Sequence, residues 1–371
     1  MGARTLGDYP RNLTQFRRRF PVDEACLRYL VETRWPDGFR CPRCGSPDAC
    51  LLDTRRLWQC RSCRHQTSAT AGTILHRSRL PLTAWFTAAY LMASLKPGIS
   101  ALQLSQQLDI HYETAWLMLH KLRRAMVNPD RSKLTGEVEV DETWIGGRQA
   151  GLKGGRQRHD RKALLVAVAV ERRTKQRTPG RPPPRHTHYL GRLRLEVVPD
   201  DRQETLGPFV ERNVERRSTV ISDAWQGYDG LAVSDYTHLS FSQAAMRRAG
   251  VEPDAVPGVH RVVSNLKTWL RGTHHGVGAD HLDHYLDEFV FRSNRRFYPM
   301  AGFATLLGLG TALPPTTTDQ ILSPLSADAT SRQRGRSTGL TTTRFSVEVN
   351  QAASLEAARG SLEGMLDDLG A

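Results

Sequence analysis

The protein has 371 residues, enough for two or three domains that each bury a core. Its 52 lysines and arginines against 38 acidic residues give a net charge of +14, which favours a nucleic-acid partner. The chain lacks an apolar run of about 20 residues that could cross a bilayer, and its first residues lack the apolar centre of a secretory signal. Composition therefore argues against a membrane-spanning or secreted protein and predicts a cytoplasmic one that associates with nucleic acid.

Four stretches of different texture follow one another along the chain. Residues 10–78 hold all the cysteines, residues 79–128 are apolar at helical spacing, and residues 135–310 alternate strand-like and helix-like patterns. From 313 to 371 the composition shifts to Thr, Ser, Ala and Gly with few aromatic residues, which is typical of disorder. We therefore predict a cysteine-rich domain, a helical module, an α/β domain and a disordered tail, in which only 353–368 suits a short amphipathic helix.

The cysteines of the first stretch include two Cys-x-x-Cys pairs. Cys41 and Cys44 are followed, after fifteen residues, by Cys60 and Cys63. Four thiolates at this separation can surround one Zn²⁺ ion tetrahedrally, and a site with all four positions filled by protein is structural rather than catalytic. The pairs therefore predict a zinc ribbon, with buried free cysteines as the alternative.

The other two cysteines and the arginines near these pairs have different expected roles. Cys26 lies in an apolar helix-like segment where we expect core packing, and Cys50 fits neither pair. Arginines surround the pairs, which suits contact with DNA phosphates, although solvated surface arginines are the alternative: Arg40, Arg43, Arg55, Arg56, Arg61 and Arg64.

The second stretch has the spacing of a helix-turn-helix. Apolar residues from Leu82 recur on one helical face until Pro97-Gly98. Ser100 can cap a short helix over 101–108, and after a three-residue link a longer helix runs to about Met126. This spacing favours DNA binding through the second helix, with a plain helical hairpin as the alternative. That helix would present Tyr112, Glu113, Thr114, His120, Lys121 and Arg124.

Two aspartates stand on predicted strands of the third stretch. Residues 136–147 alternate charged and apolar side chains, which indicates a strand that carries Asp141, and a second strand ends in Asp223. Carboxylates on rigid strands of one sheet can hold two Mg²⁺ or Mn²⁺ ions ~3.5–4 Å apart for in-line phosphoryl transfer. A turn or capping role is the alternative for each aspartate. Glu142 points to the opposite face of its strand from Asp141 and is not a candidate.

Between further predicted strands at 163–170 and 189–198, residues 172–185 carry six cations and no acid. This run predicts a flexible basic loop suited to phosphates, with surface solvation as the alternative. A helix is expected over 202–217.

The chain also resembles the DDE-type transposases of insertion sequences, specifically insertion-sequence family fifteen-ninety-five. The resemblance rests on VEVDETWIGG (138–147), ISDAWQGY (221–228) and LKTWLRGTHHG (266–276), supported by HYLDEFVFRSNRR (284–296). It covers about residues 10–310. It implies an RNase H-like mixed-sheet catalytic domain behind the zinc ribbon and the helical module, with Asp141 and Asp223 as the first metal ligands. It also implies a homo-oligomer acting on double-stranded DNA at terminal inverted repeats and target sites.

The sequence departs from this family at the third metal ligand. Such families place a Glu on a helix with a Lys or Arg seven residues later, but no Glu lies between Glu252 and Glu288. Counting back seven residues from Lys267 gives His260, whereas the family comparison favours Asn265, because some branches carry Asn. Either side chain would bind Mg²⁺ more weakly than a carboxylate. Lys267 would grip a DNA phosphate, with a solvated helix lysine as the alternative.

The expected function is metal-dependent DNA cleavage and strand transfer at the ends of an insertion sequence. A non-catalytic zinc-ribbon and helix-turn-helix regulator, or a decayed transposase, is the alternative that the missing Glu favours. A repair or restriction nuclease would share the metal chemistry without needing terminal repeats. His274 and His275, in a Gly-rich turn, either touch DNA or are structural.

Overall fold

The computed structural model describes residues 10–128, 131–146, 164–175, 188–250 and 254–322. The helix predicted at 353–368 and most of the basic run predicted at 172–185 lie outside these residues. Within the described ranges, no helix is long and apolar enough to cross a membrane.

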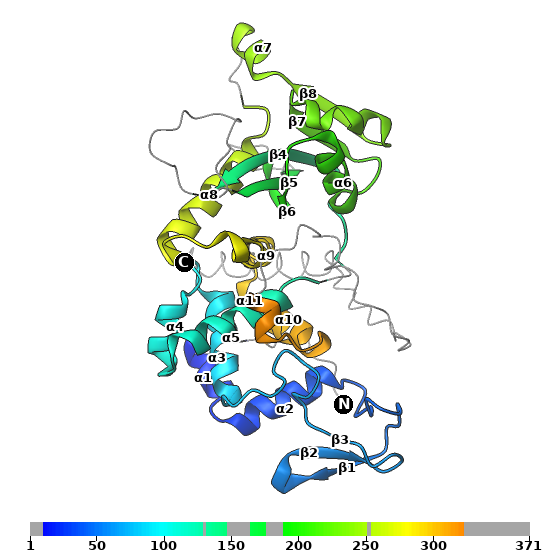
Figure 1. The fold of residues 1–371 in the computed structure, drawn as a ribbon, viewed down its shortest axis with the longest axis vertical. Helices are drawn as coiled ribbons and strands as arrows, with labels where there is room; N and C mark the ends of the chain where they lie inside the picture. Colours follow the sequence, from blue (N-terminus) through cyan, green and yellow to red (C-terminus); the bar gives the residue numbers. More distant parts are fainter. Residues whose placement is uncertain (1–9, 129–130, 147–163, 176–187, 251–253, 323–371) are drawn as a thin grey trace, which may run out of the picture. The chain divides into compact units, whose positions relative to one another are not determined.

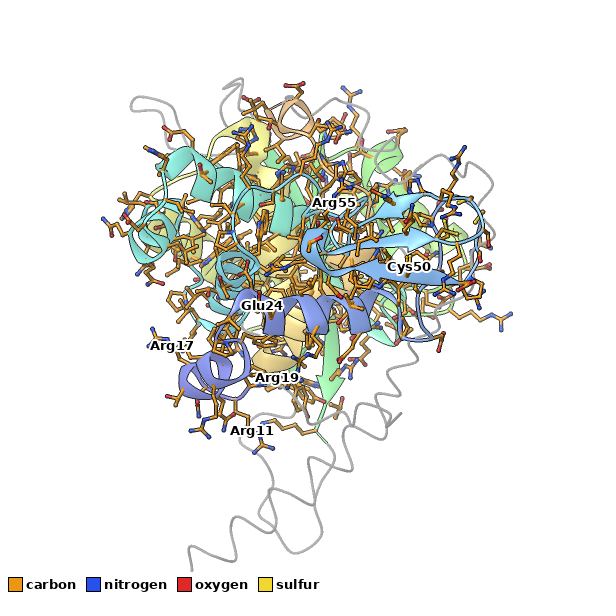
Figure 2. The ribbon with its side chains drawn as sticks, turned by 90° about the horizontal axis from the view of Figure 1, so that it is seen from below. Arg11, Arg17, Arg19, Glu24, Cys50 and Arg55 are labelled. Atoms are coloured by element: carbon orange, nitrogen blue, oxygen red, sulfur yellow. The ribbon has the colours of Figure 1, made fainter. Side chains whose placement is uncertain are left out.

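Three short strands form the cysteine-rich sheet. The strands β1 (Ala49–Leu52), β2 (Leu57–Cys60) and β3 (Gln66–Thr67) pair antiparallel in the order β1-β2-β3 (Figure 1). A 3-10 turn, η1 (Asp53–Arg55), joins β1 to β2, and Arg56 closes it in the left-handed conformation with φ of 51°. Figure 2 shows Arg55 at this turn and Cys50 on β1.

The next feature is a helical core, which is built from helices at both ends of the described part of the chain. It buries apolar side chains of five N-terminal helices and, from the far end of the chain, Phe303, Leu306 and Leu307. Sequence order alone therefore does not define this core. The N-terminal helices are α1 (Leu13–Arg19), α2 (Asp23–Arg34), α3 (Leu82–Ser94), α4 (Ala101–Leu108) and α5 (Tyr112–Ala125), and the C-terminal helix is α10 (Pro299–Ala312).

The third stretch forms a five-stranded mixed sheet in the order β6-β5-β4-β7-β8. The pairs β6-β5 and β5-β4 are antiparallel, whereas β4-β7 and β7-β8 are parallel. This arrangement confirms the predicted mixed α/β fold class. The strands are β4 (Glu137–Ile145), β5 (Leu164–Thr174), β6 (His188–Val198), β7 (Thr219–Asp223) and β8 (Thr237–Phe241).

Helical elements cover both faces of this sheet because alternate side chains of its buried strands point to opposite sides. Val138 and Val140 on β4 face a core that contains α6 (Gln203–Asn213) and η2 (Gln226–Val233). The opposite core contains Ile145 of β4 with side chains of α8 (Pro257–His274) and α9 (Leu282–Asn294). The remaining elements are α7 (Gln243–Arg248), η3 (Ala279–His281) and α11 (Thr318–Leu322).

Two expectations are corrected here. The tail expected to be disordered from residue 313 contains α11, where Ile321 is buried and the carbonyl of Gln320 accepts a hydrogen bond from Arg124 Nη1 at 3.2 Å. The basic run begins inside β5, where Arg172 pairs with Glu139 and Arg173 with Glu171, so these cations are engaged within the fold.

Candidate active site and zinc site

The four cysteines of the two pairs converge on one point. Their Sγ atoms all lie within 4.8 Å of one another, with Cys41 3.6 Å from Cys63 and Cys44 3.6 Å from Cys60. A tetrahedral zinc ion with Zn–S bonds of 2.3 Å needs sulfur atoms about 3.8 Å apart. The donor set and its spacing therefore fit a structural Zn²⁺.

The backbone of both cysteine pairs makes the same tight turn. The amide of Gly45 donates to the carbonyl of Cys41 at 2.9 Å, and the amide of Arg64 donates to that of Cys60 at 3.0 Å. Both residues adopt positive φ, which costs nothing for glycine but is unusual for arginine. The other two cysteines stay outside this cluster: Cys26 is fully buried in the helical core, as expected, and Cys50 Sγ contacts the carbonyl of Gln59 at 3.7 Å.

Asp141 and Asp223 come from neighbouring parallel strands. The register pairs Val138 with Val220 and Glu139 with Ile221, and the two aspartates each follow the last of these pairs by two residues. Asp223 is the last residue of β7, and its Oδ1 accepts the amide of Trp225 at 3.2 Å, which turns the chain away from the sheet.

The surroundings of Tyr228 show where negative charge gathers. Its ring is fully buried, and its hydroxyl donates to Glu142 Oε2 at 3.1 Å. Burial raises the pKa of Tyr228, and the nearby charges of Glu142, Asp141 and Asp223 raise it further. The ends of β4 and β7 therefore carry negative charge on both faces of the sheet near Tyr228.

His260 and Lys267 lie on α8 and contact β4. His260 Nε2 is 3.6 Å from Asp141 Oδ2, while its Nδ1 is 2.8 Å from Asp254 Oδ1. The neighbouring carboxylate of Asp141, with a further contribution from Asp254, raises the pKa of His260 to about 8. Lys267 Nζ donates to Thr143 Oγ1 at 2.9 Å.

Asn265 lies on a different side of the same helix. It is exposed, and it follows His260 by five residues, which turns it by about 140° around the helix axis. The structure thus places His260 against Asp141 and Lys267 against Thr143 of β4, with Asp223 on the adjacent strand, whereas Asn265 lies on another side of α8.

Sequence reasoning overlooked two partners at this site. Thr143 follows Asp141 by two residues, and the period of a strand already puts both on one face. Asp254 precedes α8 by only three residues, but nothing in its sequence neighbourhood indicates that it approaches His260.

Comparison with known families covers both sites. The ISXO2-like transposase domain family matches residues 133–294, which include both aspartates and α8. The transposase zinc-ribbon domain family matches residues 21–66, which include all four clustered cysteines. Two separate regions of the chain are therefore similar to transposase domains, one catalytic and one a zinc ribbon.

Individual relatives are also transposable-element proteins. An uncharacterized protein in transposable element ISH50, from Halobacterium salinarum, is 28% identical over 301 residues, or 74% of this chain and 92% of the relative. An uncharacterized transposase-like protein of Haemophilus influenzae is 26% identical over 98 residues, or 26% of this chain and 77% of the relative. No solved structure matches the chain.

The helix that was expected to read DNA, α5, is packed along much of its length. Tyr112, at its start, is 49% exposed, whereas Lys121 and Arg124 are half-buried. The expectation that His120 faces DNA is wrong, because it is fully buried with Nδ1 2.8 Å from His284 Nδ1. That histidine forms part of the contact between α5 and α9.

The two histidines after α8 differ in their environment. His274 packs against the rings of Trp269 and Tyr285, and burial lowers its pKa to about 3. His275 is exposed and ends α8 in the left-handed conformation, with φ of 56°.

Proposed function

We propose that the protein is the transposase of an insertion sequence, which cleaves DNA at the ends of its element and joins the freed strands to target DNA. The observation that carries this proposal is that Asp141 and Asp223 lie on adjacent parallel strands, within a region that matches the ISXO2-like transposase domain family. Strand cleavage and strand joining are both in-line displacements at phosphorus, so one site can serve both steps.

The donor chemistry suits Mg²⁺ or Mn²⁺. Asp141 and Asp223 offer carboxylate oxygens, and bound ions of this kind supply charge stabilisation to the attacking and leaving oxygens. Among the described residues, only the four cysteines form a cluster of three or more closely spaced ligands. Water and DNA phosphates would therefore complete the coordination of the ions, as is usual for Mg²⁺.

The side chains of α8 complete the proposed site. His260, held between Asp141 and Asp254, orients the Asp141 carboxylate and contacts the reacting phosphate from the side of α8. Lys267 stands beside Thr143 on the same face of β4 and binds the DNA backbone near the cleaved bond. Asn265 is the alternative third residue, although its engagement would require α8 to rotate.

DNA recognition is assigned to the basic N-terminal half. The zinc ribbon carries arginines around its four cysteines, and Tyr112, Lys121 and Arg124 lie on α5 beside it in sequence. We propose that these elements bind the terminal inverted repeats as double-stranded DNA, and that the protein works as a homo-oligomer joining two ends of its element.

The first experiment measures cleavage of a labelled duplex that carries the end of the element, with Mg²⁺ or Mn²⁺. Metal-dependent nicking at the repeat boundary is expected, and Asp141→Ala and Asp223→Ala should each abolish it. The matched control is Asp229→Ala, because Asp229 is an exposed carboxylate six residues beyond Asp223. Specific binding without nicking in either metal would instead identify a non-catalytic regulator or a decayed enzyme, and nicking that survives both active-site changes would exclude this site.

The same assay compares the candidates on α8. His260→Ala should lower the nicking rate by about tenfold to hundredfold, the range for a misplaced reacting group. Asn265→Ala should leave the rate within about threefold, less than 1 kcal/mol of barrier. The reverse order of effects would assign the third position to Asn265.

A further inference from the structure

The helix that carries His260 and Lys267 has no cap of its own. The N-cap residue of α8 is Val256, which offers no side-chain hydrogen bond, and Pro257 at the first helical position has no N–H. The next amides of the first turn belong to Gly258 and Val259, which are both buried and therefore need acceptors within the protein.

A carboxylate from β4 supplies these acceptors. Glu139 Oε2 accepts the amide of Gly258 at 2.6 Å and that of Val259 at 3.1 Å. Glu139 is only 2% exposed, so its charge is held by these amides, by the positive end of the helix dipole and by Arg172. Arg172 Nε donates to Glu139 Oε1 at 2.7 Å, and its Nη2 donates to the carbonyl of Ala255 at 3.2 Å.

The absence of a side chain at residue 258 makes this approach possible. A β-carbon there would stand 2.7 Å from Glu139 Oε2 and 2.9 Å from Leu190 Cδ2, closer than carbon atoms are tolerated. Gly258 therefore allows the helix to approach the carboxylate this closely, and a larger residue would displace the Glu139 and Leu190 side chains.

Three successive side chains on one face of β4 contact α8 in order. Glu139 meets Gly258 and Val259 at the start of the helix, and Asp141 meets His260 one residue further. Two residues further along β4, Thr143 meets Lys267, two turns along the helix. The contact at Glu139 is the most buried of the three. It fixes the position of the first turn of α8 on β4, and this position determines which helix residues reach Asp141 and Thr143.

We propose that Glu139 is a positioning residue that caps α8 from the neighbouring strand and so sets the register in which His260 meets Asp141. It acts through the helix and not on DNA, and its effect on catalysis rests on the proposed function. Loss of the cap lets the first turn of α8 fray and shifts His260 and Lys267 relative to the aspartates.

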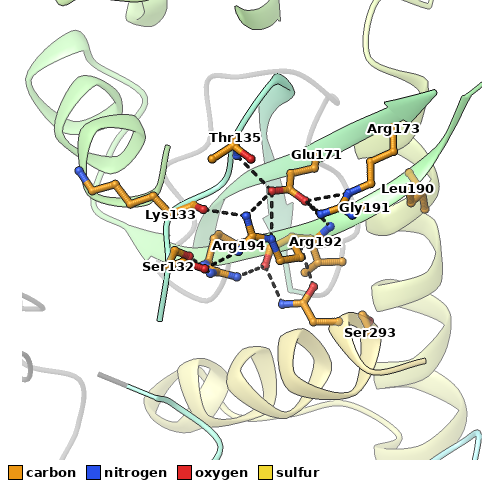
Figure 3. A network of polar contacts seen from close by, with 12 residues as sticks. Ser132, Lys133, Thr135, Glu171, Arg173, Leu190, Gly191, Arg192, Arg194 and Ser293 are labelled. Atoms are coloured by element: carbon orange, nitrogen blue, oxygen red, sulfur yellow. Dashed lines mark hydrogen bonds and ion pairs between the residues drawn. The ribbon is translucent and has the colours of Figure 1, made fainter. Parts of the chain in front are cut away.

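The test uses the full-length, zinc-loaded protein and four variants. Glu139→Ala removes both acceptors, Glu139→Gln retains an amide oxygen that can cap the helix, and Gly258→Ala pushes α8 away while leaving Glu139 intact. The matched control is Glu171→Gln. Glu171 is 1% exposed on the same sheet, and its carboxylate is held by Arg173 of β5, by Arg192 of β6 and by the amide of Thr135 before β4 rather than by α8 (Figure 3).

Amide hydrogen exchange of residues 255–267 reports the cap without any need for activity. Exchange at Gly258 and Val259 should be faster in Glu139→Ala than in the native protein, and close to native in Glu139→Gln and Glu171→Gln. Unchanged exchange in Glu139→Ala would overturn the inference, whether or not the protein cuts DNA.

The nicking rate per folded molecule reports the consequence for the site. Glu139→Ala and Gly258→Ala should lower it by about tenfold to hundredfold, and Glu139→Gln should restore most of it. Adding His260→Ala to Glu139→Ala should lower the rate little further, because both changes disable the same contact. If the effects of Glu139→Ala and His260→Ala on the rate were fully additive, or if Glu139→Ala nicked at the native rate, the positioning role would be rejected. If the native protein never nicked DNA, the proposed function would be rejected, and the exchange result alone would decide whether Glu139 caps α8.

Discussion

At the scale of single residues, Glu171 shows how a buried charge is accommodated in the sheet. Its carboxylate accepts hydrogen bonds from Arg192, from Arg173 and from the amide of Thr135 (Figure 3). Burial by itself raises the pKa of a carboxyl group, but the hydrogen bonds and charge of Arg192 outweigh it and lower the pKa of Glu171 to about 2. The ionised form is therefore the one that the fold stabilises.

Removing this carboxylate should be costly. Glu171→Ala leaves Arg192 without its partner in a largely buried position, and breaking such a pair costs about 3–5 kcal/mol of unfolding free energy. Urea denaturation at pH 7 measures this loss. Glu196→Ala is the milder comparison, because Glu196 forms its ion pair with Arg212 in a partly exposed position. Because the pKa of Glu171 is lowered in the folded state, its contribution is present above about pH 4.5 and is lost as the pH falls toward 2. Equal losses in the two variants would contradict this account.

The zinc site gives a second prediction at the residue scale. Cys44→Ser should release the metal and lower the melting temperature, because three remaining thiolates bind zinc far less tightly than four. A colorimetric chelator should detect one zinc per native chain and none per variant chain. Cys50→Ser is the matched control, since Cys50 lies on the same small sheet and stays outside the cluster. Loss of zinc from Cys50→Ser would mean that the ligand set is different.

At the scale of elements, α5 and α9 meet through buried histidines. His120 and His284 share a hydrogen bond between their Nδ1 atoms, so one ring must donate and the other accept, and both cannot be protonated. Burial lowers the pKa of both, to about 3 for His284, and Arg123 and Arg124 add to the shift of His284. The contact is therefore made by neutral rings.

This contact should make the fold sensitive to mild acid. The pKa of each histidine is lowered in the folded state, so its contribution is present above the unfolded value of 6.5 and is lost as the pH falls below it. Each ring then lowers the unfolding free energy by up to about 1.4 kcal/mol per pH unit. Denaturation between pH 7 and 5 should show a shallower pH dependence in His284→Asn than in the native protein. His111→Gln, at an exposed histidine before α5, should keep the native slope.

The same elements show what sequence could and could not predict. Alternation of charged and apolar residues predicted the strand that carries Asp141, and a short apolar run predicted the strand that ends in Asp223, because each pattern depends only on neighbouring residues. The helical pattern of α5 gave its bounds but not its buried face, since His120 is covered by α9, which comes more than 150 residues later. Likewise, counting along α8 could not choose between His260 and Asn265, because the register of α8 on β4 depends on long-range contacts at Glu139 and Thr143.

At the scale of the whole molecule, the helical core depends on both ends of the described chain. Phe303 of α10 is 1% exposed and contacts the rings of Phe16, Phe20 and Phe86. Phe303→Ala should lower the unfolding free energy by about 3–5 kcal/mol, the usual cost of such a cavity. Phe297→Ala is the matched control, since this ring is 67% exposed and should change stability by about 0.5 kcal/mol or less. Thermal or urea unfolding measures both, and similar losses would mean that α10 does not complete the core.

Because α10 packs against the N-terminal helices, the parts of the protein fold in a definite order as the chain is synthesised. The zinc ligands end at residue 63, so the metal can bind while most of the protein is still untranslated. The helical core, in contrast, lacks Phe303, Leu306 and Leu307 until translation has passed α10, after every described strand of the five-stranded sheet has been made. A truncated transcript that ends within the sheet would therefore yield a chain that can bind zinc but has an open helical core.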